Sequence, residues 1–249
     1  MGARARPVGL AEAQSLFDLM EPPRPMVHGV EGHRARMRTR LLTAGPDALA
    51  DHEMLEMLLF LALPRRDTKP IARLLLDRFG NFSATISASP AELLGVEGLG
   101  EAGAAALKLV QGASHRLLRD AVRQEPVLTD WNRLLEYLVG ILAHEKTEQA
   151  RVLFLDAKNR LLADEVQVRG TVNQTMVYPR EIVRRALELH ATSIILVHNH
   201  PSGDPTASRE DIAMTQTVQR AAGVLGITLT DHVIIAGNQW LSFRTQGLL

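Results

Sequence analysis

The chain has 249 residues, 46% of them hydrophobic and 22% charged, which is the composition of a globular protein with a sizeable core. Lys plus Arg and Asp plus Glu each total 28, so the balanced charge excludes a general attraction to nucleic acid or membranes and leaves only local patches. The absence of cysteine excludes disulfides and thiolate metal ligands and is typical of a cytoplasmic protein. We expect one large domain or two ordinary ones.

Residues 1–31 are expected to form a flexible lead-in, because the stretch "EPPRPMVHG" within them is rich in proline and glycine. The beginning of the chain lacks the apolar stretch of a signal peptide. The most apolar run, "MLEMLLFLALP", carries Glu56 and is too short to span a bilayer. We therefore expect neither a secretory segment nor a membrane partner.

Residues 32–125 are predicted to be helical throughout and to form an N-terminal domain. Gly80 follows the helical pattern "TKPIARLLLDRF" and is expected to be its C-cap. Ser89 is expected to be the N-cap of the next helix, with Pro90 at its first position. The stretch "RQEPVLTDW" interrupts the helical pattern and places the domain boundary near Pro126.

The stretch "LLGVEGLGEAGAAALKLV" predicts two helices joined by a turn at Gly98 and Gly100, and it resembles a helix-hairpin-helix. Glycines in such a turn let the backbone approach a DNA phosphate, which the free N–H groups of the second helix can then bind. Glu101 and Gly103 stand where such hairpins often have proline and a basic residue. Two interpretations stay open, a DNA contact and a turn that serves packing alone.

A local basic patch is predicted in "HRARMRTRLL". Arg34 and Arg38 share one helix face, as do Arg36 and Arg40. Such a patch favours non-sequence-specific DNA contact, although a run of charge is also typical of an ordinary solvated surface.

Residues 126–249 mix strands and helices. "ARVLFLDAKNRLLADEVQV" predicts a hairpin, "TSIILV" a buried strand, and "HVIIAG" and "WLSF" closing strands. "YPREIVRRALELHA" and "SREDIAMTQTVQRAAGVLG" predict helices. The expected fold class is α+β, with a mixed sheet in the second domain. Asp231 and His232 are expected in a turn before their strand, with a supporting role behind metal ligands as the alternative.

The stretch "LVHNHPSGDPTASRED" carries the chemistry. His198 and His200 end a predicted strand, so both imidazoles point to one face while Asn199 points to the other. Ser208 begins a predicted helix and Asp211 lies in its first turn, near the histidines if the intervening loop folds back. Two imidazoles and one carboxylate are a typical ligand set for catalytic zinc. Ser208 and Asp211 alone also fit an ordinary capping box.

The spacing His198-x-His200-x7-Ser208-x2-Asp211 resembles the signature of the JAMM (MPN+) metalloproteases, and "HNHPSGDPTASRED" resembles their bacterial RadC-type, UPF0758-like branch. The resemblance covers residues 126–249, with support from "RVLFLD" and "DHVIIAGNQWLSF". It implies a layered domain like that of cytidine deaminases, preceded by a helix-hairpin-helix domain.

The resemblance also implies roles for individual residues. His198, His200 and Asp211 would bind one Zn²⁺ per chain, and Ser208 would stabilise the tetrahedral intermediate. The general base of the family precedes the first core strand, where this chain has Glu148; Glu145 and Glu165 are the alternatives. The one departure in the motif is Ala207, which replaces a proline usual in the RadC-type branch.

The function predicted from the sequence is therefore zinc-dependent hydrolysis of a peptide or isopeptide bond, with an unknown protein or peptide as substrate. The alternative is a DNA-binding, DNA-repair-associated protein in which the metal is structural. An HNH nuclease, a barrel amidohydrolase and a non-haem iron enzyme fit less well: the first has scattered motif residues, the second needs a longer domain, and the third needs a co-substrate site.

Overall fold

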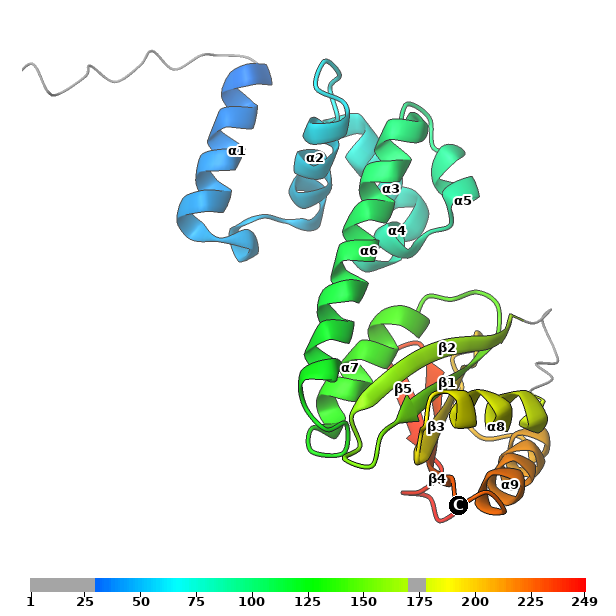
Figure 1. Ribbon diagram of the computed structural model, residues 1–249. Helices are drawn as coiled ribbons and strands as arrows, with labels where there is room; N and C mark the ends of the chain where they lie inside the picture. Colours follow the sequence, from blue (N-terminus) through cyan, green and yellow to red (C-terminus); the bar gives the residue numbers. More distant parts are fainter. Residues whose placement is uncertain (1–29, 170–177) are drawn as a thin grey trace, which may run out of the picture.

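The computed structural model describes residues 30–169 and 178–249, so the predicted lead-in lies almost wholly outside the described residues. Two regions follow each other along the chain (Figure 1), which we call the helical region (α1–α6) and the sheet region (α7–β5). The helices of the helical region are α1 (Val30–Ala44), the 3-10 helix η1 (Pro46–Ala48), α2 (Asp51–Ala62), α3 (Lys69–Phe79), α4 (Phe82–Ser87), α5 (Pro90–Leu94) and α6 (Gly100–Gln124). The elements of the sheet region are α7 (Trp131–Leu142), β1 (Gln149–Leu155), β2 (Leu161–Arg169), α8 (Pro179–Glu188), β3 (Ser193–Asn199), α9 (Arg209–Gly223), β4 (Thr228–Ala236) and β5 (Gln239–Ser242).

Helix boundaries in the helical region follow the signals in the sequence. Gly80 ends α3 with a φ of 92°, a left-handed conformation that glycine adopts without strain. Ser89 caps α5 by accepting a hydrogen bond from the N–H of Glu92, and Pro90 occupies the first position of the helix. These predicted caps are confirmed.

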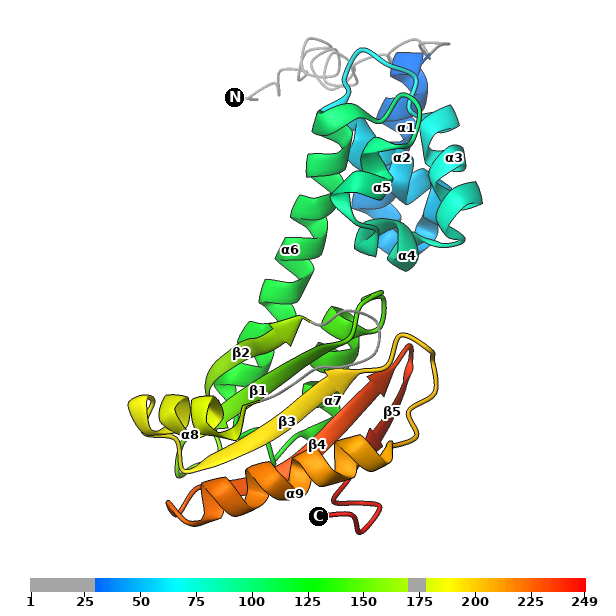
Figure 2. The ribbon, with the colours of Figure 1, turned by 90° about the vertical axis from the view of Figure 1, so that its right-hand side faces the viewer.

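The helix α6 joins the two regions (Figure 2). Its 25 residues span about 37 Å at 1.5 Å per residue. Leu107, in its first half, is buried in the core of the helical region, whereas Val122, near its end, is buried against α7 in the sheet region. The two cores are therefore connected by one continuous helix, and the expected boundary residue Pro126 lies just after it.

The sheet has the strand order β2-β1-β3-β4-β5. β1 pairs antiparallel with both β2 and β3, β3 pairs parallel with β4, and β4 pairs antiparallel with β5. The predicted hairpin is present as β1 and β2, and the sheet is mixed. The predicted α+β class is confirmed.

Helices cover both faces of the sheet (Figure 2). Leu153 and Val197 belong to the core that packs on α7, whereas Val152 and Leu196 belong to the core beneath α8 and α9. This alternation fixes which strand residues can meet α9, because neighbouring residues of a strand point to opposite faces. In the described ranges no helix is long and apolar enough to cross a membrane.

Candidate metal centre

The end of β3 and the first turn of α9 bring three candidate ligands together. His198 lies in β3 and His200 directly follows the strand, so both side chains are on the face that α9 covers. Asp211 lies in the first turn of α9. One ligand atom from each of the three residues lies within 4.8 Å of the others. The structure thus places the two histidines and the aspartate selected from the sequence at one point.

The distances between these atoms fit a tetrahedral zinc ion. Bonds of about 2.0–2.1 Å place neighbouring ligand atoms of a tetrahedron about 3.4 Å apart. The Nε2 atoms of His198 and His200 are 2.9 Å apart, and Oδ1 of Asp211 is 3.2 Å from Nε2 of His198. Oδ2 of Asp211 is 3.6 Å from Nε2 of His200. Both the donor types and their spacing suit Zn²⁺, and three protein ligands are typical of catalytic rather than structural zinc.

The two carboxylate oxygens of Asp211 have different partners. Oδ2 accepts hydrogen bonds from the backbone N–H and the hydroxyl of Ser208, at 2.8 and 2.7 Å. Oγ of Ser208 accepts from the N–H of Asp211 at 3.1 Å, which completes a capping box. Oδ1 lies toward His198. Capping and metal binding are therefore compatible, because each uses a different oxygen.

The hydroxyl of Ser208 has one hydrogen, and in this structure it is donated to Asp211. The role implied for Ser208, donation to an oxyanion, requires the hydroxyl to rotate away from Oδ2. The backbone N–H of Ser208 would still hold that oxygen. Ser208 is an exposed residue at the start of α9.

The pKa values of Asp211 and His200 are both shifted at this site. Burial acts to raise the pKa of Asp211, but hydrogen bonds with His198 and His200 outweigh burial and hold the pKa well below its usual range. The hydrogen bond with Asp211 raises the pKa of His200 against the opposing effect of burial. The carboxylate is therefore ionised throughout the neutral range, as a metal ligand has to be.

The loop after β3 orients His200. Nδ1 of His200 lies 2.8 Å from the carbonyl oxygen of Asp204. A carbonyl oxygen only accepts, so Nδ1 carries the hydrogen and Nε2 keeps its lone pair for a metal. The loop turns back at Gly203, whose φ is 84° and whose N–H donates to the carbonyl of His200 at 3.1 Å. A residue with a side chain would be strained at Gly203.

His232 lies directly behind His198. Its Nε2 is 2.8 Å from Nδ1 of His198, and its side chain has no exposed surface. The predicted turn location of Asp231 and His232 is wrong, because both residues are buried inside β4. Parallel pairing places His232 beside Leu196, on the sheet face that also carries His198. Burial lowers the pKa of His232 well below its ordinary value, which favours the neutral imidazole.

The side chain of Asp231 points to the sheet face opposite His232 and binds residues in and just after β5. Its Oδ1 accepts from the N–H of Arg244 at 3.0 Å, and its Oδ2 accepts from the hydroxyl of Ser242 at 2.5 Å. This residue therefore holds β4 and β5 together rather than supporting a ligand.

Glu148 precedes β1 at a position opposite His200. Ala150 pairs with His198, so continuing the antiparallel register by two residues places Glu148 beside His200 on the same face. The negative charge of Glu148 is one of the smaller causes that raise the pKa of His200. Glu148 is half-buried.

The two alternative glutamates face elsewhere. The charge of Glu145 acts on Lys108 and His115, both on α6 and therefore away from α9. Glu165 forms a two-pronged ion pair with Arg185 of α8. Of the three glutamates considered, the geometry favours Glu148 as the one beside the candidate ligands.

Asn199, between the two histidines, binds the segment that carries Glu148. Its Oδ1 accepts from the N–H of Gln149 at 2.9 Å, and its Nδ2 donates to the carbonyls of Thr147 and Glu145 at 3.1 and 3.3 Å. The side chain is 1% exposed. The alternation of strand residues predicts that Asn199 lies on the far face, but it does not predict these bonds, because they depend on the pairing of β1 with β3.

Known proteins resemble the chain over most of its length. A family model described as RadC-like JAB domain matches residues 128–248, and one described as UPF0758 N-terminal matches residues 32–105. A UPF0758 protein of Rhodobacter capsulatus is 56% identical over 213 residues, which are 86% of this chain and 100% of the relative. A UPF0758 protein of Ruegeria pomeroyi is 50% identical over 220 residues, 88% of this chain and 98% of the relative.

The chain belongs to the UPF0758 family. The RadC-like JAB match contains every strand of the sheet and all three candidate ligands, and it confirms the resemblance found in the sequence. The UPF0758 N-terminal match covers most of the helical region, including the glycine turn.

The glycine turn of the UPF0758 N-terminal region is built as predicted. Gly98 and Gly100 have φ values of 81° and 61°, and α6 begins at Gly100. Close packing favours glycine at position 103, because a Cβ on Gly103 would lie 2.5 Å from Cδ1 of Leu99. The carbonyl of Gly98 accepts a hydrogen bond from Nη1 of Arg66 at 2.8 Å, a contact between residues 32 apart that no local sequence pattern predicts.

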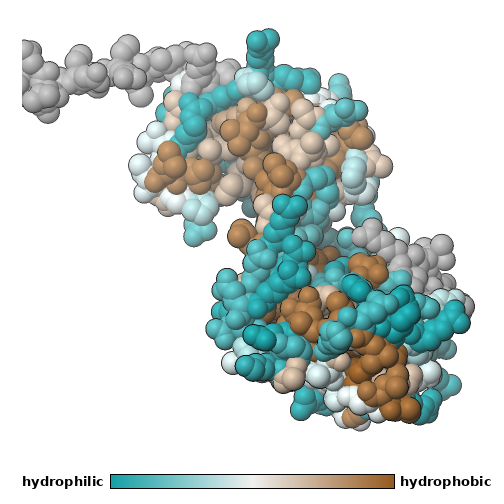
Figure 3. Space-filling model, in the orientation of Figure 1, coloured by the Kyte–Doolittle hydropathy of each residue, from teal (hydrophilic) through white to brown (hydrophobic). Residues whose placement is uncertain are grey.

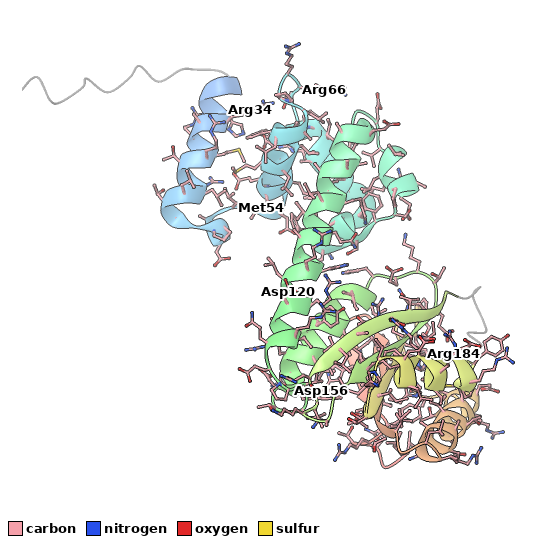
Figure 4. All side chains as sticks on the ribbon, in the orientation of Figure 1. Arg34, Met54, Arg66, Asp120, Asp156 and Arg184 are labelled. Atoms are coloured by element: carbon pink, nitrogen blue, oxygen red, sulfur yellow. The ribbon has the colours of Figure 1, made fainter. Side chains whose placement is uncertain are left out.

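The predicted basic patch of this UPF0758 chain is partly used for internal contacts. Arg34 donates to the carbonyls of Pro64 and Arg66 and lies over the ring of Phe60; Figure 4 shows Arg34 and Arg66 at the same end of the helical region. Arg40 forms an ion pair with Glu53.

The remaining two arginines of the patch, Arg36 and Arg38, are exposed. Residues 30–125 contain 13 basic and 12 acidic residues, so the region has almost no net charge. On the face drawn in Figure 3, hydrophobic residues occupy much of the middle of this region and hydrophilic residues lie mainly around its edge. The geometry therefore supplies a smaller basic surface than the sequence pattern indicated.

Proposed function

We propose that this UPF0758-family protein is a zinc-dependent hydrolase of the JAMM type that cleaves a peptide or isopeptide bond. The observation that carries the proposal is that His198, His200 and Asp211 each offer one ligand atom within 4.8 Å of the others, with the two Nε2 atoms 2.9 Å apart. A Zn²⁺ ion held there would supply a Lewis acid that polarises a carbonyl and lowers the pKa of water to about 7.

Glu148 is the proposed general base. Its position beside His200 allows it to take a proton from water and to pass that proton to the leaving amine. Its partial burial, and its flanking segment fixed by Asn199, restrict where the carboxylate can lie. A carboxylate held in place near the reacting water accelerates the reaction more than a mobile one, because less entropy is lost on reaching the transition state.

Ser208 is the proposed oxyanion donor. Rotation of its hydroxyl from Oδ2 of Asp211 toward a substrate would free one hydrogen bond for the developing charge. Oδ2 of Asp211 would still accept the hydrogen bond from the backbone N–H of Ser208, which would hold the carboxylate in place in the first turn of α9. The substrate class, a protein or peptide amide, rests on the family resemblance.

The test is the metal content of the full chain purified without chelators. We expect one zinc per chain in the wild type and a loss of zinc in His198→Ala and in Asp211→Ala. His144→Ala, at an exposed histidine outside the site, is the matched control and should retain the metal. A wild-type protein without zinc that also fails to take up added zinc would contradict the proposal.

Non-sequence-specific DNA contact is a second candidate function. The supporting observation is that the guanidinium of Arg66 lies at the turn of Gly98. It supplies a positive charge there, which the nearby Glu101 cannot do. DNA affinity should then fall with salt and fall further when Arg36 and Arg38 are changed to Ala. Fluorescence anisotropy with a short duplex measures this, and an absence of binding at low salt eliminates DNA contact while leaving the zinc proposal intact.

A further inference from the structure

Two buried side chains form an outer layer behind the candidate ligands. Nε2 of His232 lies 2.8 Å from Nδ1 of His198, and Nδ1 of His232 lies 2.6 Å from Oγ1 of Thr215. His232 is 0% exposed and Thr215 is 1% exposed, so water does not compete for these contacts. Buried polar groups of this kind need partners, and each of these has one on both sides.

The hydroxyl of Thr215 sets the direction of these hydrogen bonds. Its Oγ1 lies 2.6 Å from the backbone carbonyl of Asp211, one turn earlier in α9. A carbonyl only accepts, so the single hydroxyl hydrogen of Thr215 is directed to Asp211. The same oxygen can then only accept from His232, whose Nδ1 has to carry a hydrogen.

The position of this hydrogen determines the tautomer of His198. A neutral His232 with its hydrogen on Nδ1 has a lone pair on Nε2, and this lone pair faces Nδ1 of His198. Nδ1 of His198 therefore donates, and Nε2 of His198 is left with its lone pair. This Nε2 lies 2.9 Å from Nε2 of His200 and 3.2 Å from Oδ1 of Asp211.

We propose that Thr215 and His232 are positioning residues that hold His198 in the tautomer whose Nε2 binds metal. Metal-bound histidines usually donate their second N–H to a carboxylate, a carbonyl or water, whereas here the acceptor is another imidazole whose own hydrogen is fixed by a threonine. This inference rests on the proposed function, because the tautomer of His198 matters only if His198 is a ligand.

The same two anchors also link the ligands to each other. Thr215 belongs to α9, which carries Asp211, and His232 belongs to β4, which is paired with the strand of His198. The hydrogen bond between Thr215 and His232 therefore fixes the helix against the sheet at the level of the site. Without this hydrogen bond, the distance between His198 and Asp211 should vary more, and His198 should no longer be held in one tautomer.

Substitutions at Thr215 separate this role from packing. Thr215→Val keeps the volume and removes the hydroxyl, whereas Thr215→Ser keeps the hydroxyl and removes a methyl group. We expect Thr215→Val to bind zinc roughly 10- to 100-fold more weakly than the wild type, and Thr215→Ser to bind within about threefold of it. Competition with a chromophoric zinc chelator measures both constants on the full chain. If Thr215 served packing alone, Thr215→Ser would bind zinc more weakly than Thr215→Val. That order of affinities would overturn the inference.

A second pair at His232 tests the acceptor. The amide oxygen of His232→Gln can still accept from His198, whereas His232→Leu cannot, so His232→Gln should retain more of the zinc affinity. Equal affinities of the two variants would count against the inference. Circular dichroism of the metal-free variants establishes that each is folded.

Nitrogen-15 NMR of the histidine side chains reads the tautomer without any zinc measurement. We expect His232 to carry its hydrogen on Nδ1; a hydrogen on Nε2 overturns the inference. Failure here is distinguishable from failure of the proposed function. A wild type that binds no zinc defeats the proposed function, whereas a wild type that binds zinc no more tightly than Thr215→Val defeats only the role of the outer layer.

Discussion

The helical region and the sheet region use their polar side chains differently. In the helical region, charged groups bond to fixed partners within the fold. Arg34 holds two carbonyls of the α2–α3 loop, and Lys108 donates to the carbonyls of Ile86 and Ala88 at 3.2 and 2.9 Å. The buried carboxylate of Glu56 has His33 as its partner. These groups stabilise loops and helix ends.

In the sheet region, buried polar groups support one another around a common point. Asp204 orients His200, His232 orients His198, and Ser208 occupies one oxygen of Asp211. Each support leaves one lone pair of the supported residue directed at the same place. The candidate site therefore differs from the helical region less in charge than in the way its buried groups are held, with each candidate ligand keeping a free lone pair for a metal.

The largest change in rate is expected for the proposed general base, Glu148. Glu148→Gln should keep zinc and lower the rate of amide hydrolysis by about 10²- to 10⁴-fold, because the proton acceptor is lost while the ligands stay. A fluorogenic peptide library screened with the wild type supplies the substrate for the measurement. Glu145→Gln is the matched control, since Glu145 faces α6. Unchanged turnover in Glu148→Gln would move the base to another residue.

The next effect is on stability. Asn199→Leu should lower the free energy of unfolding by about 2–4 kcal/mol, because the buried N–H of Gln149 and the carbonyl of Thr147 lose their partner. Urea denaturation monitored by circular dichroism measures the loss, and Asn238→Leu, at an exposed position in the β4–β5 turn, serves as control. A loss of less than about 0.5 kcal/mol would show that the segment carrying Glu148 is held by other contacts.

The contrast with the helical region can be sharpened at Arg34. Arg34→Ala should destabilise the protein by about 1–2 kcal/mol through the loss of its two carbonyl contacts. Arg36→Ala and Arg38→Ala, at exposed positions of the same helix, should stay within about 0.5 kcal/mol of the wild type. Thermal unfolding compares the three. Equal effects would mean that the internal use of Arg34 contributes nothing to the fold.

The smallest expected effect is a dependence of zinc affinity on pH. The hydrogen bond with Asp211 raises the pKa of His200, so protons compete for Nε2 at a higher pH than they would for an isolated histidine. Lowering the pH through that pKa should weaken zinc binding, approaching about tenfold for each pH unit below it. Chelator competition between about pH 8 and about pH 6 follows the change. A constant affinity over this range would show that His200 releases no proton on binding.

Local rules were sufficient to predict much of the fold and part of the candidate site. The caps at Gly80 and Ser89 and the β1–β2 hairpin depend on neighbouring residues, and all of them are present. The meeting of His198, His200 and Asp211 also follows from short-range geometry, since two-residue alternation and one loop bring them together.

Among the supporting residues, the sequence offered such a role only for Asp231 and His232, as the alternative to a turn, and did not show which ligand either would support. His232 reaches His198 only because β3 and β4 pair in parallel, 34 residues apart in the chain. Asn199 meets the segment of Glu148 across a similar gap, through the pairing of β1 with β3. An arginine that holds a distant loop, such as Arg34, has the same sequence signature as one that faces solvent. Strand register and tertiary contacts therefore carry what the pattern alone does not.

X-ray absorption at the zinc edge of the zinc-loaded protein reports directly which side chains bind the metal. We predict a first shell of four nitrogen and oxygen atoms at about 2.0–2.1 Å, with the outer scattering of two imidazole rings, and only one ring in His198→Ala when that variant is loaded with excess zinc. A first shell without imidazole scattering, or with a number of rings that His198→Ala leaves unchanged, would contradict the claim that the end of β3 and the start of α9 form the metal centre.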